Sequence, residues 1–365
     1  MMEEQYTANW FSKPGDSIRA IMHRKQITAQ QVAEELDGGI LLLRSLLDGS
    51  KEIDEPVAKN LSLVLGATPH FWLTRQKNFE KAIARSIASI RPEDTHDLIT
   101  KIPVPGAKIS FKMTDARRAE EIRRRLVYFG VSNFKVWQQR YGGLIDSTAF
   151  RSTQAYEMRE EAVLMWLRRG EIEADLIDTK PWEPGNLLDR LEAIKKLSLQ
   201  KLPKLFLPKL RTLLAEAGVA LVVVKSPQGC RASGATRLIA PDKAMLLMSF
   251  RHRSDDHFWF TMFHEIGHLV LHQAHTFVEG EMAAYDHRED EANDFARRCI
   301  IPDDRTSEFE ELLPEKMPVL RFSASLRIAP GLTVGQMQKW RKIGPEKLNY
   351  LKRRWTWDQI DAVSV

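Results

Sequence analysis

The sequence predicts an α+β protein that is mostly helical, with a small sheet in its second half. Most of the 365 residues follow apolar patterns with helical spacing. The run VALVVVK at residues 219–225 is rich in β-branched residues and is typical of a buried strand. Two further strand-like segments, GCRASGATRLIA and AMLLMSF, precede a long apolar helix at residues 258–272. A small sheet leading into a buried helix is an α+β arrangement.

Composition limits the classes of protein that this chain can be. A length of 365 residues predicts two or three domains, and 43% hydrophobic with 28% charged residues is typical of a soluble globular protein. No apolar run approaches the roughly 20 residues of a membrane span, and the opening MMEEQYTANW is too polar for a signal peptide. Two cysteines cannot form a disulfide framework. We therefore expect a cytoplasmic protein with no membrane partner, whose net charge of +5 permits nucleic-acid contact without requiring it.

Residues 14–80 predict several short helices separated by tight turns. Thr28 is an N-cap candidate for TAQQVAEEL, with Gln31 as its capping-box partner. A glycine-containing turn then leads into a helix at residues 40–47, which makes a helix-turn-helix arrangement. Two more helices follow at residues 56–65 and 69–79.

This N-terminal region resembles the HigA-type antitoxin branch of the helix-turn-helix repressors. The resemblance rests on PGDSIRAIM, TAQQVAEEL, LLDGSKEIDEPVAKNLSLVLGATPHFW and the Leu-x-x-Gln from Leu73 to Gln76. It implies an all-α domain at residues 1–80 that binds operator DNA through residues 28–50, as a homodimer, and regulates transcription of its own operon.

The recognition helix departs from that pattern. Polar or basic side chains should face base edges in the major groove. Arg44 and Ser45 are the only polar residues nearby, and the corresponding positions are Gly38, Gly39, Ile40, Leu41 and Leu42. Because an apolar helix face more often meets protein, both DNA binding and a module for dimerisation or partner docking stay open.

Residues 81–150 are predicted to form a helical connector. IRPEDTHDLITKIPVPGAK is rich in turn-forming residues, and DARRAEEIRRRLVYFG has the pattern of a basic amphipathic helix. Its arginines could contact phosphates, or they could form a solvated face neutralised by Glu120 and Glu121.

The sequence His264-Glu265-Ile266-Gly267-His268 carries the clearest chemistry. Histidines four residues apart lie on one helix face, so both can bind one zinc ion while Glu265 serves as the general base. The amphipathic run EDEANDFARRCII at residues 289–301 supplies Glu291 as the predicted third ligand, with its neighbour Glu289 as the less favoured choice. Two histidines and one glutamate leave a coordination position open, which is typical of catalytic rather than structural zinc.

The second half of the chain resembles the ImmA/IrrE family of zinc metallopeptidases. The motifs are ASGATRLI, LMSFRHRSDDHFWFTMFHEIGHLVLH, EDEANDFARRCIIP and LRIAPGLTVGQMQ, within residues 150–355. The resemblance implies a small zincin-like domain at residues 151–365 that cleaves a specific regulatory protein, typically a helix-turn-helix repressor. It also implies that His264, His268 and Glu291 bind zinc and that Glu265 is the catalytic base.

The predicted function is therefore a zinc-dependent endopeptidase acting on a repressor-like partner in a stress, phage-response or toxin–antitoxin setting. The alternative is an antitoxin-like regulator that binds DNA or a partner protein and whose peptidase domain is latent or sensory. A peptide substrate would add as a strand to a sheet edge formed by ASGATRLI or AMLLMSF. Three side chains could stabilise an oxyanion: Tyr285, His287 and Arg251. His272 and His275 are candidates for further ligands, but His272 lies a full turn beyond His268, so a hydrogen-bonded histidine at the helix end is the favoured interpretation for it.

Overall fold

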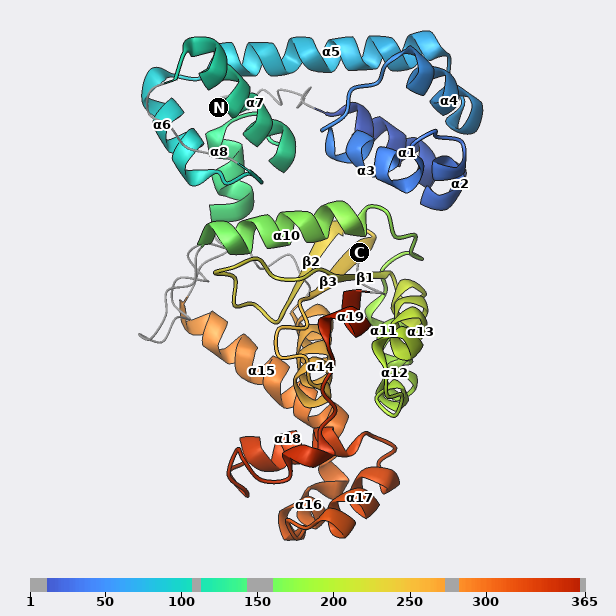
Figure 1. Ribbon diagram of the computed structural model, residues 1–365, viewed down its shortest axis with the longest axis vertical. Helices are drawn as coiled ribbons and strands as arrows, with labels where there is room; N and C mark the ends of the chain where they lie inside the picture. The colour runs from blue at the N-terminus through green and yellow to red at the C-terminus, as the bar shows by residue number, and fades with distance from the viewer. Residues whose placement is uncertain (1–11, 107–112, 143–159, 273–281, 362–365) are drawn as a thin grey trace, which may run out of the picture. The chain divides into compact units, whose positions relative to one another are not determined.

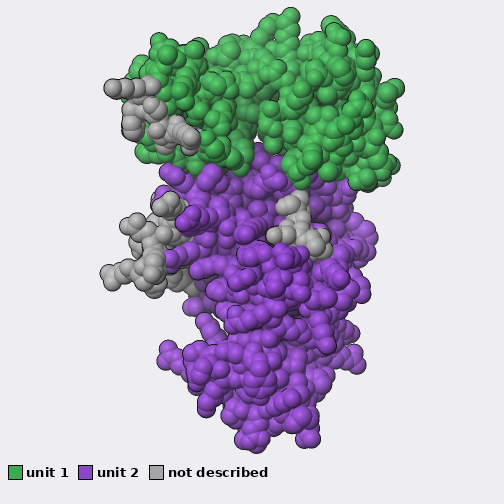
Figure 2. Space-filling view, viewed as in Figure 1, with its two compact units in different colours: residues 1–145 green, residues 146–365 purple. Residues whose placement is uncertain are grey.

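The computed structural model describes residues 12–106, 113–142, 160–272 and 282–361, and it separates into two compact units (Figure 2). Unit 1 is residues 1–145 and unit 2 is residues 146–365. The described residues are mostly helical and contain one three-stranded sheet, which confirms the α+β class. The domain boundaries drawn from the sequence at residues 80 and 150 stay predictions.

Unit 1 consists of helices in its described residues (Figure 1). They are α1 (Pro14–Lys25), α2 (Ala29–Glu34), α3 (Gly39–Asp48), α4 (Glu55–Leu65), α5 (Pro69–Ala88), α6 (Pro92–Lys101), α7 (Asp115–Phe129), α8 (Phe134–Trp137) and the π-helical turn η1 (Gln138–Gly142). Thr28 caps α2, and its backbone N–H donates to the side chain of Gln31, so the predicted capping box forms. The fifth helix continues nine residues beyond its predicted end at residue 79.

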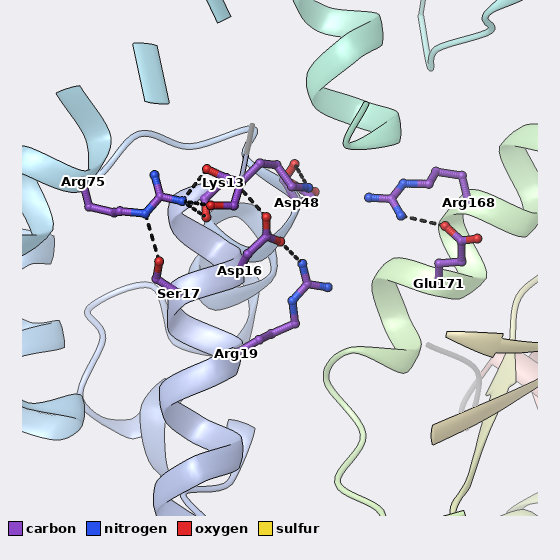
Figure 3. Close-up of polar contacts among 9 residues, drawn as sticks. Lys13, Asp16, Ser17, Arg19, Asp48, Arg75, Arg168 and Glu171 are labelled. Carbon is purple, nitrogen blue, oxygen red and sulfur yellow. Dashed lines mark hydrogen bonds and ion pairs between the residues drawn. The ribbon is translucent and has the colours of Figure 1, made fainter. Parts of the chain in front are cut away.

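Arg75 of α5 ties that helix to the start of α1 (Figure 3). Its guanidinium donates to the Ser17 hydroxyl and to the Lys13 carbonyl, both at 3.0 Å. Burial lowers the pKa of Arg75 from its ordinary value, although Asp16 nearby opposes the shift. Helix α5 is also linked to the end of α4, because the indole N–H of Trp72 donates to the Gly66 carbonyl at 3.2 Å.

Helix α3 has one buried and one exposed face. The buried side chains are Leu43, Leu46 and Leu47. Ile40 is 37% exposed and Leu41 is 64% exposed, on the helix that should read bases in a helix-turn-helix repressor. The predicted apolar character of that face is therefore present on the surface.

The arginine run of α7 is largely engaged in ion pairs. Arg123 pairs with Glu80 at 2.9 Å, Arg124 pairs with Glu121 at 2.8 Å, and Arg125 is buried against the same Glu121. These contacts favour the reading of a helix neutralised by acidic residues over a phosphate-binding surface.

Unit 2 contains the sheet and the helices that surround it (Figure 1). Its elements are α10 (Glu160–Ala174), α11 (Pro184–Leu188), α12 (Leu191–Leu197), α13 (Pro203–Ala215), β1 (Val219–Val223), β2 (Gly234–Ala240), β3 (Lys243–Met248), α14 (Asp255–Leu271), α15 (Met282–Ile300), η3 (Asp303–Arg305), α16 (Thr306–Glu311), α17 (Lys316–Ser325), α18 (Pro330–Lys339), η4 (Asn349–Leu351) and α19 (Trp357–Asp361).

The sheet has the strand order β1-β3-β2, with β1 parallel and β2 antiparallel to the central strand. Strands β2 and β3 form a hairpin in which Ala240 pairs with Lys243. All three strands lie where the sequence predicts them. Because β2 is an edge strand, one of its sides has no strand partner among the described residues.

Alternate residues of the strands face two different helices. Thr236 of β2 points to α14, where its hydroxyl meets Glu265. The next residue, Arg237, points to α10 and donates to Glu171 at 2.7 Å. Glu171 also accepts from Arg168 at 2.7 Å (Figure 3), so a buried ion-pair group fixes α10 to the edge strand. The sheet is therefore covered on one face by α10 and on the other by α14.

The first turn of α14 is held by buried acidic side chains. Oδ1 of Asp255 accepts from the backbone N–H groups of Asp256 and Arg353 at 2.9 and 3.0 Å. Asp256 pairs with Lys352 at 2.6 Å. The side chains of Asp255, Asp256 and Lys352 are each at most 8% exposed. Gly331 of α18 lies against the Asp255 carboxylate, where a Cβ atom would overlap its oxygens. The segment after α18 thus anchors the helix that carries the histidine motif.

Candidate metal centre

Helix α14 presents His264 and His268 on one face, one turn apart, as the motif predicts. Their Nε2 atoms lie 3.0 Å from each other. Buried apolar neighbours on the same helix include Met262, Phe263 and Ile266, which belong to the main core cluster of unit 2. The other faces of the helix are therefore fixed by packing, and the two histidines lie at the edge of the core.

Helix α15 brings a carboxylate to the two histidines. Glu289 places Oε1 3.0 Å from Nε2 of His268 and Oε2 3.4 Å from Nε2 of His264. The ligand atoms of these three residues all lie within 4.8 Å of one another. Among the described residues, they make up the one group of histidine, cysteine or acidic side chains with the spacing of a metal site.

Small residues allow the two helices to approach. A Cβ atom on Gly267 would lie 3.2 Å from Cα of Ala292 and 3.2 Å from the ring of Phe295. Ala292 is itself fully buried. The glycine inside the histidine motif therefore has a packing function: it sets the distance from which Glu289 reaches the histidines.

Glu291, the predicted third ligand, lies outside the group of His264, His268 and Glu289. Its Oε2 is 2.9 Å from Nε2 of His272, its Oε1 is 3.3 Å from Nδ1 of His287, and its side chain is 44% exposed. The structure thus brings together the alternative ligand and not the favoured one.

The reason is the helical position of the two carboxylates. The face of α15 that meets α14 contains Glu289, Ala292, Asn293 and Ala296, at the spacing i, i+3, i+4, i+7. Glu291 is two residues from Glu289, which is about 200° around the helix. The sequence contains this pattern, because Ala292 and Ala296 follow Glu289 at the spacing i+3 and i+7 of one helix face.

Each of the two histidines also makes a hydrogen bond through its second ring nitrogen. Nδ1 of His264 lies 3.1 Å from the side-chain oxygen of Asn293, and Nδ1 of His268 lies 3.1 Å from Nδ1 of His272. Such outer contacts orient metal-binding histidines and select the tautomer that leaves Nε2 available. Sequence reasoning did not assign this role to Asn293 or to His272.

Glu265, the predicted base, lies buried beside the histidines at 7% exposure. The Thr236 hydroxyl of β2 donates to its Oε2 at 3.1 Å. A Cβ atom on Gly234 would lie 2.7 Å from Cγ of Glu265 and 2.7 Å from Thr261, so only glycine lets the strand come this close. The start of β2 and the base are therefore in direct contact.

Burial and neighbouring charges shift the proton equilibria of these groups. Burial raises the pKa of Glu265, while the two histidines beside it oppose that shift. For His264 burial acts against the charged form, but the hydrogen bond to Glu289 and the charges of Glu265 and Glu289 outweigh it and raise its pKa. Burial lowers the pKa of His272, and the hydrogen bond from His272 lowers the pKa of Glu291. Burial therefore shifts both groups toward their uncharged forms, by raising the pKa of the Glu265 carboxyl and lowering the pKa of the His272 imidazole.

The donor set fits a zinc ion. Zinc bonds of about 2.0–2.1 Å in a tetrahedron put neighbouring ligand atoms roughly 3.3 Å apart. The separations of 3.0 and 3.4 Å among the two imidazole nitrogens and the Glu289 oxygens are close to that value. Two imidazoles, one carboxylate and no thiolate match catalytic zinc sites in ligand type.

The other residues singled out in the sequence lie away from the group. His275 and the side chain of Tyr285 lie outside the part of the chain that the structure describes. His287 is 74% exposed, and Arg251 donates to the backbone carbonyl of Arg231. Cys230, which the sequence does not assign to the site, is buried and does not join the histidines and Glu289, and burial raises its pKa.

A match to a known protein family covers the strand and the two helices that form this group. Residues 231–326 match the IrrE N-terminal-like domain, a family of zinc metallopeptidases. No curated protein and no solved structure matched the chain.

The match to the IrrE N-terminal-like domain begins just before β2 and ends just after α17. It therefore contains the edge strand, both helices of the metal group, and His264, Glu265, His268 and Glu289. Strand β1, helix α10 and helix α18 lie outside it, although the sequence resemblance was drawn over residues 150–355. Within the described residues, no helix is long and apolar enough to cross a membrane.

Proposed function

We propose that this chain is a zinc-dependent endopeptidase that cleaves a specific regulatory protein. The observation that carries the proposal is the convergence of His264, His268 and Glu289 beside the buried Glu265. The same segment matches a zinc metallopeptidase family, which makes hydrolysis of a peptide bond the reaction to expect.

The residues have distinct parts in that reaction. His264, His268 and Glu289 would hold the zinc ion, and Glu265 would act as general base and acid. Zinc bound there supplies a Lewis acid for the peptide carbonyl and makes water easier to deprotonate. Glu265 is positioned through one oxygen by Thr236, and its raised pKa suits a group that takes a proton from water and returns it to the leaving amine.

The edge strand β2 suggests how a substrate would bind. Gly234 at its start contacts Glu265, and within the part of the chain that the structure describes one side of the strand has no partner strand. An extended peptide that adds to this edge would run past the base, with main-chain hydrogen bonds supplying affinity. By its resemblance to ImmA/IrrE peptidases, the substrate we propose is a repressor-like protein in a stress, phage-response or toxin–antitoxin setting.

The test adds purified, zinc-loaded wild-type protein or the zinc-loaded Glu265→Gln variant to an extract of the cells that produce this protein. Newly formed protein N-termini would be labelled and identified by mass spectrometry. We expect a small number of new N-termini with the wild type and none with Glu265→Gln, while zinc content stays at one per chain in both.

Asp290→Asn is the matched control, because Asp290 is an exposed carboxylate on α15 outside the metal group. It should produce the same cleavage products as the wild type. Cleavage that persists in zinc-loaded Glu265→Gln would remove Glu265 from the mechanism. The absence of any new N-terminus from zinc-loaded wild-type protein would contradict the peptidase assignment.

A second function is proposed for unit 1, as a module that binds operator DNA or docks a partner protein. The α2–turn–α3 arrangement supports it, and α3 contains Arg44 and the exposed Leu41. Operator binding by the full chain should weaken steeply with salt, and Arg44→Glu should abolish it if phosphates or bases are contacted. If Leu41→Asp instead blocks dimerisation or partner capture and Arg44→Glu does not, the module binds protein.

A further inference from the structure

We propose that Glu291 and His272 act together as positioning residues that set the tautomer of the zinc ligand His268. This inference rests on the zinc site proposed above and extends it beyond the three ligands and the base. It also gives Glu291 a role that differs from the one expected from the sequence.

The evidence is a continuous line of side chains that leads away from the metal group. Nδ1 of His268 lies 3.1 Å from Nδ1 of His272, and Nε2 of His272 lies 2.9 Å from Oε2 of Glu291. The other oxygen of Glu291 lies 3.3 Å from Nδ1 of His287. His272 is 9% exposed at its side chain, whereas Glu291 is 44% exposed, so the line runs from the interior to the surface.

The protons along this line can be assigned from the carboxylate inward. An ionised carboxylate only accepts, so Nε2 of His272 must carry the hydrogen that it donates to Glu291. A neutral imidazole then has a lone pair on its other nitrogen, and Nδ1 of His272 accepts from Nδ1–H of His268. With its hydrogen on Nδ1, His268 keeps the lone pair of Nε2, the atom that faces His264 and Glu289.

Without the carboxylate this order would be lost. An imidazole that does not face an anion populates both neutral tautomers, and in one of them Nδ1 of His272 would carry a hydrogen directed at His268. His268 would then have to accept at Nδ1, which moves its own hydrogen to Nε2, and molecules in this form must rearrange before His268 can bind zinc. Glu291 therefore acts on zinc affinity through His272, without touching the ion.

The two histidine ligands are supported by different chemistry. His264 meets the neutral amide of Asn293, while His268 meets a chain that ends in a negative charge. A charged outer partner makes an imidazole a stronger ligand, and loss of such partners typically weakens metal binding by about 10–100-fold. The effect of removing Glu291 should fall in that range, well short of the loss expected for a direct ligand.

The experiment measures zinc affinity of the full chain by competition with a chelator for wild type, Glu291→Gln, Glu289→Gln and Asp290→Asn. We expect Glu291→Gln to bind zinc about 10–100-fold more weakly and Asp290→Asn to stay within about twofold of wild type. Glu289→Gln should lose more than either, because it changes the carboxylate that faces both histidines. All three variants replace one carboxylate of α15 by the corresponding amide, so they differ only in the position of the lost charge.

A second readout follows the tautomers themselves. Nitrogen-15 NMR of the imidazole rings distinguishes Nδ1–H from Nε2–H in the protein without added metal. His272 should be the Nε2–H form in the wild type and a mixture in Glu291→Gln, with His268 changing in parallel, while Asp290→Asn leaves both spectra unchanged.

Each result is decisive for a different part of the proposal. Unchanged zinc affinity together with unchanged tautomers in Glu291→Gln would overturn the positioning role. Zinc retained in Glu289→Gln but abolished in Glu291→Gln would make Glu291 the ligand and overturn it as well. If the wild type binds no zinc, the proposed function fails, and the tautomer measurement still decides whether Glu291 and His272 order His268.

Discussion

The two ends of helix α14 bury polar side chains for opposite purposes. At the first turn, Asp256 meets Lys352 at 2.6 Å and Asp255 accepts two backbone N–H groups, so donors face acceptors. At the other end, Nε2 of His264 and Nε2 of His268 face each other at 3.0 Å with a carboxylate beside them. At the first end each acidic side chain meets donors, although one oxygen of Asp255 and one oxygen of Asp256 are buried without a hydrogen-bond partner among the described residues, and the second end gathers electron donors around one point.

The comparison shows how a structural polar cluster differs from a ligand site on the same helix. Buried polar groups are stable where each has a partner of opposite character. Donor atoms of the same kind that converge are favourable only when a cation is shared between them. Substitution of a side chain at the first end should therefore change folding stability, and substitution of a side chain at the second end should change metal binding.

The largest expected effect is at the histidine end. His264→Ala should weaken zinc binding by at least about 1000-fold, because it removes one of the three proposed protein ligands. The free energy of unfolding measured with chelator present should change by about 1 kcal/mol or less, since the side chain is at the edge of the core. A large loss of stability without metal would mean that His264 is structural.

Lys352→Met should have the largest effect on folding. Lys352 is the cation paired with the buried Asp256, and its removal leaves that carboxylate without its charged partner. Loss of one member of a buried pair typically costs about 3–5 kcal/mol of unfolding free energy, measured by urea denaturation.

The double variant Lys352→Met/Asp256→Asn provides the control for that measurement. It removes the unpaired charge and should recover at least half of the lost stability. Zinc affinity should be unchanged in every variant of this pair, and a parallel loss of zinc would contradict the separation of the two ends.

Asp255→Asn should make the protein more stable at neutral pH. Burial raises the pKa of Asp255 from 3.8 to about 6, so the folded protein binds a proton here between these values and stability falls as pH rises through that window. A shift of about two units corresponds to roughly 3 kcal/mol at most, and the uncharged variant should regain about 1–2 kcal/mol of it above pH 6.

The measurement is chemical denaturation of both proteins from pH 4 to pH 8. The two curves should meet near pH 4 and separate as pH rises. Equal stability at all pH values would show that Asp255 is not the group that causes the change.

A pair of glycine variants gives the smallest effects and sharpens the contrast. In Gly331→Ala the new Cβ would overlap the Asp255 carboxylate, which should cost about 1–2 kcal/mol of stability and leave zinc affinity unchanged. In Gly267→Ala the new Cβ would lie 3.2 Å from Cα of Ala292 and push α15 away. We expect it to weaken zinc binding about tenfold with little change in metal-free stability, because Glu289 moves with that helix.

Much of the fold could be read from local patterns. The capping box at Thr28 and the three strands lie where periodicity and turn residues predict them. Helix ends are less predictable, because α5 continues to Ala88 into the segment that the sequence predicts as a connector. The last nine residues of α5 include Ile83, which is buried by neighbours from elsewhere in unit 1, so tertiary packing extends the helix.

By itself the sequence determined the chemistry of the site: two histidines one turn apart, a glutamate beside them and an acidic helix downstream. Helical periodicity is a local property, so residues four apart share a face whatever surrounds them. The tertiary structure decided which carboxylate meets the histidines, a choice that the spacing of the small residues after Glu289 only indicates. That choice depends on how α14 and α15 pack at Gly267 and Ala292, which turns Glu289 inward and leaves Glu291 to His272.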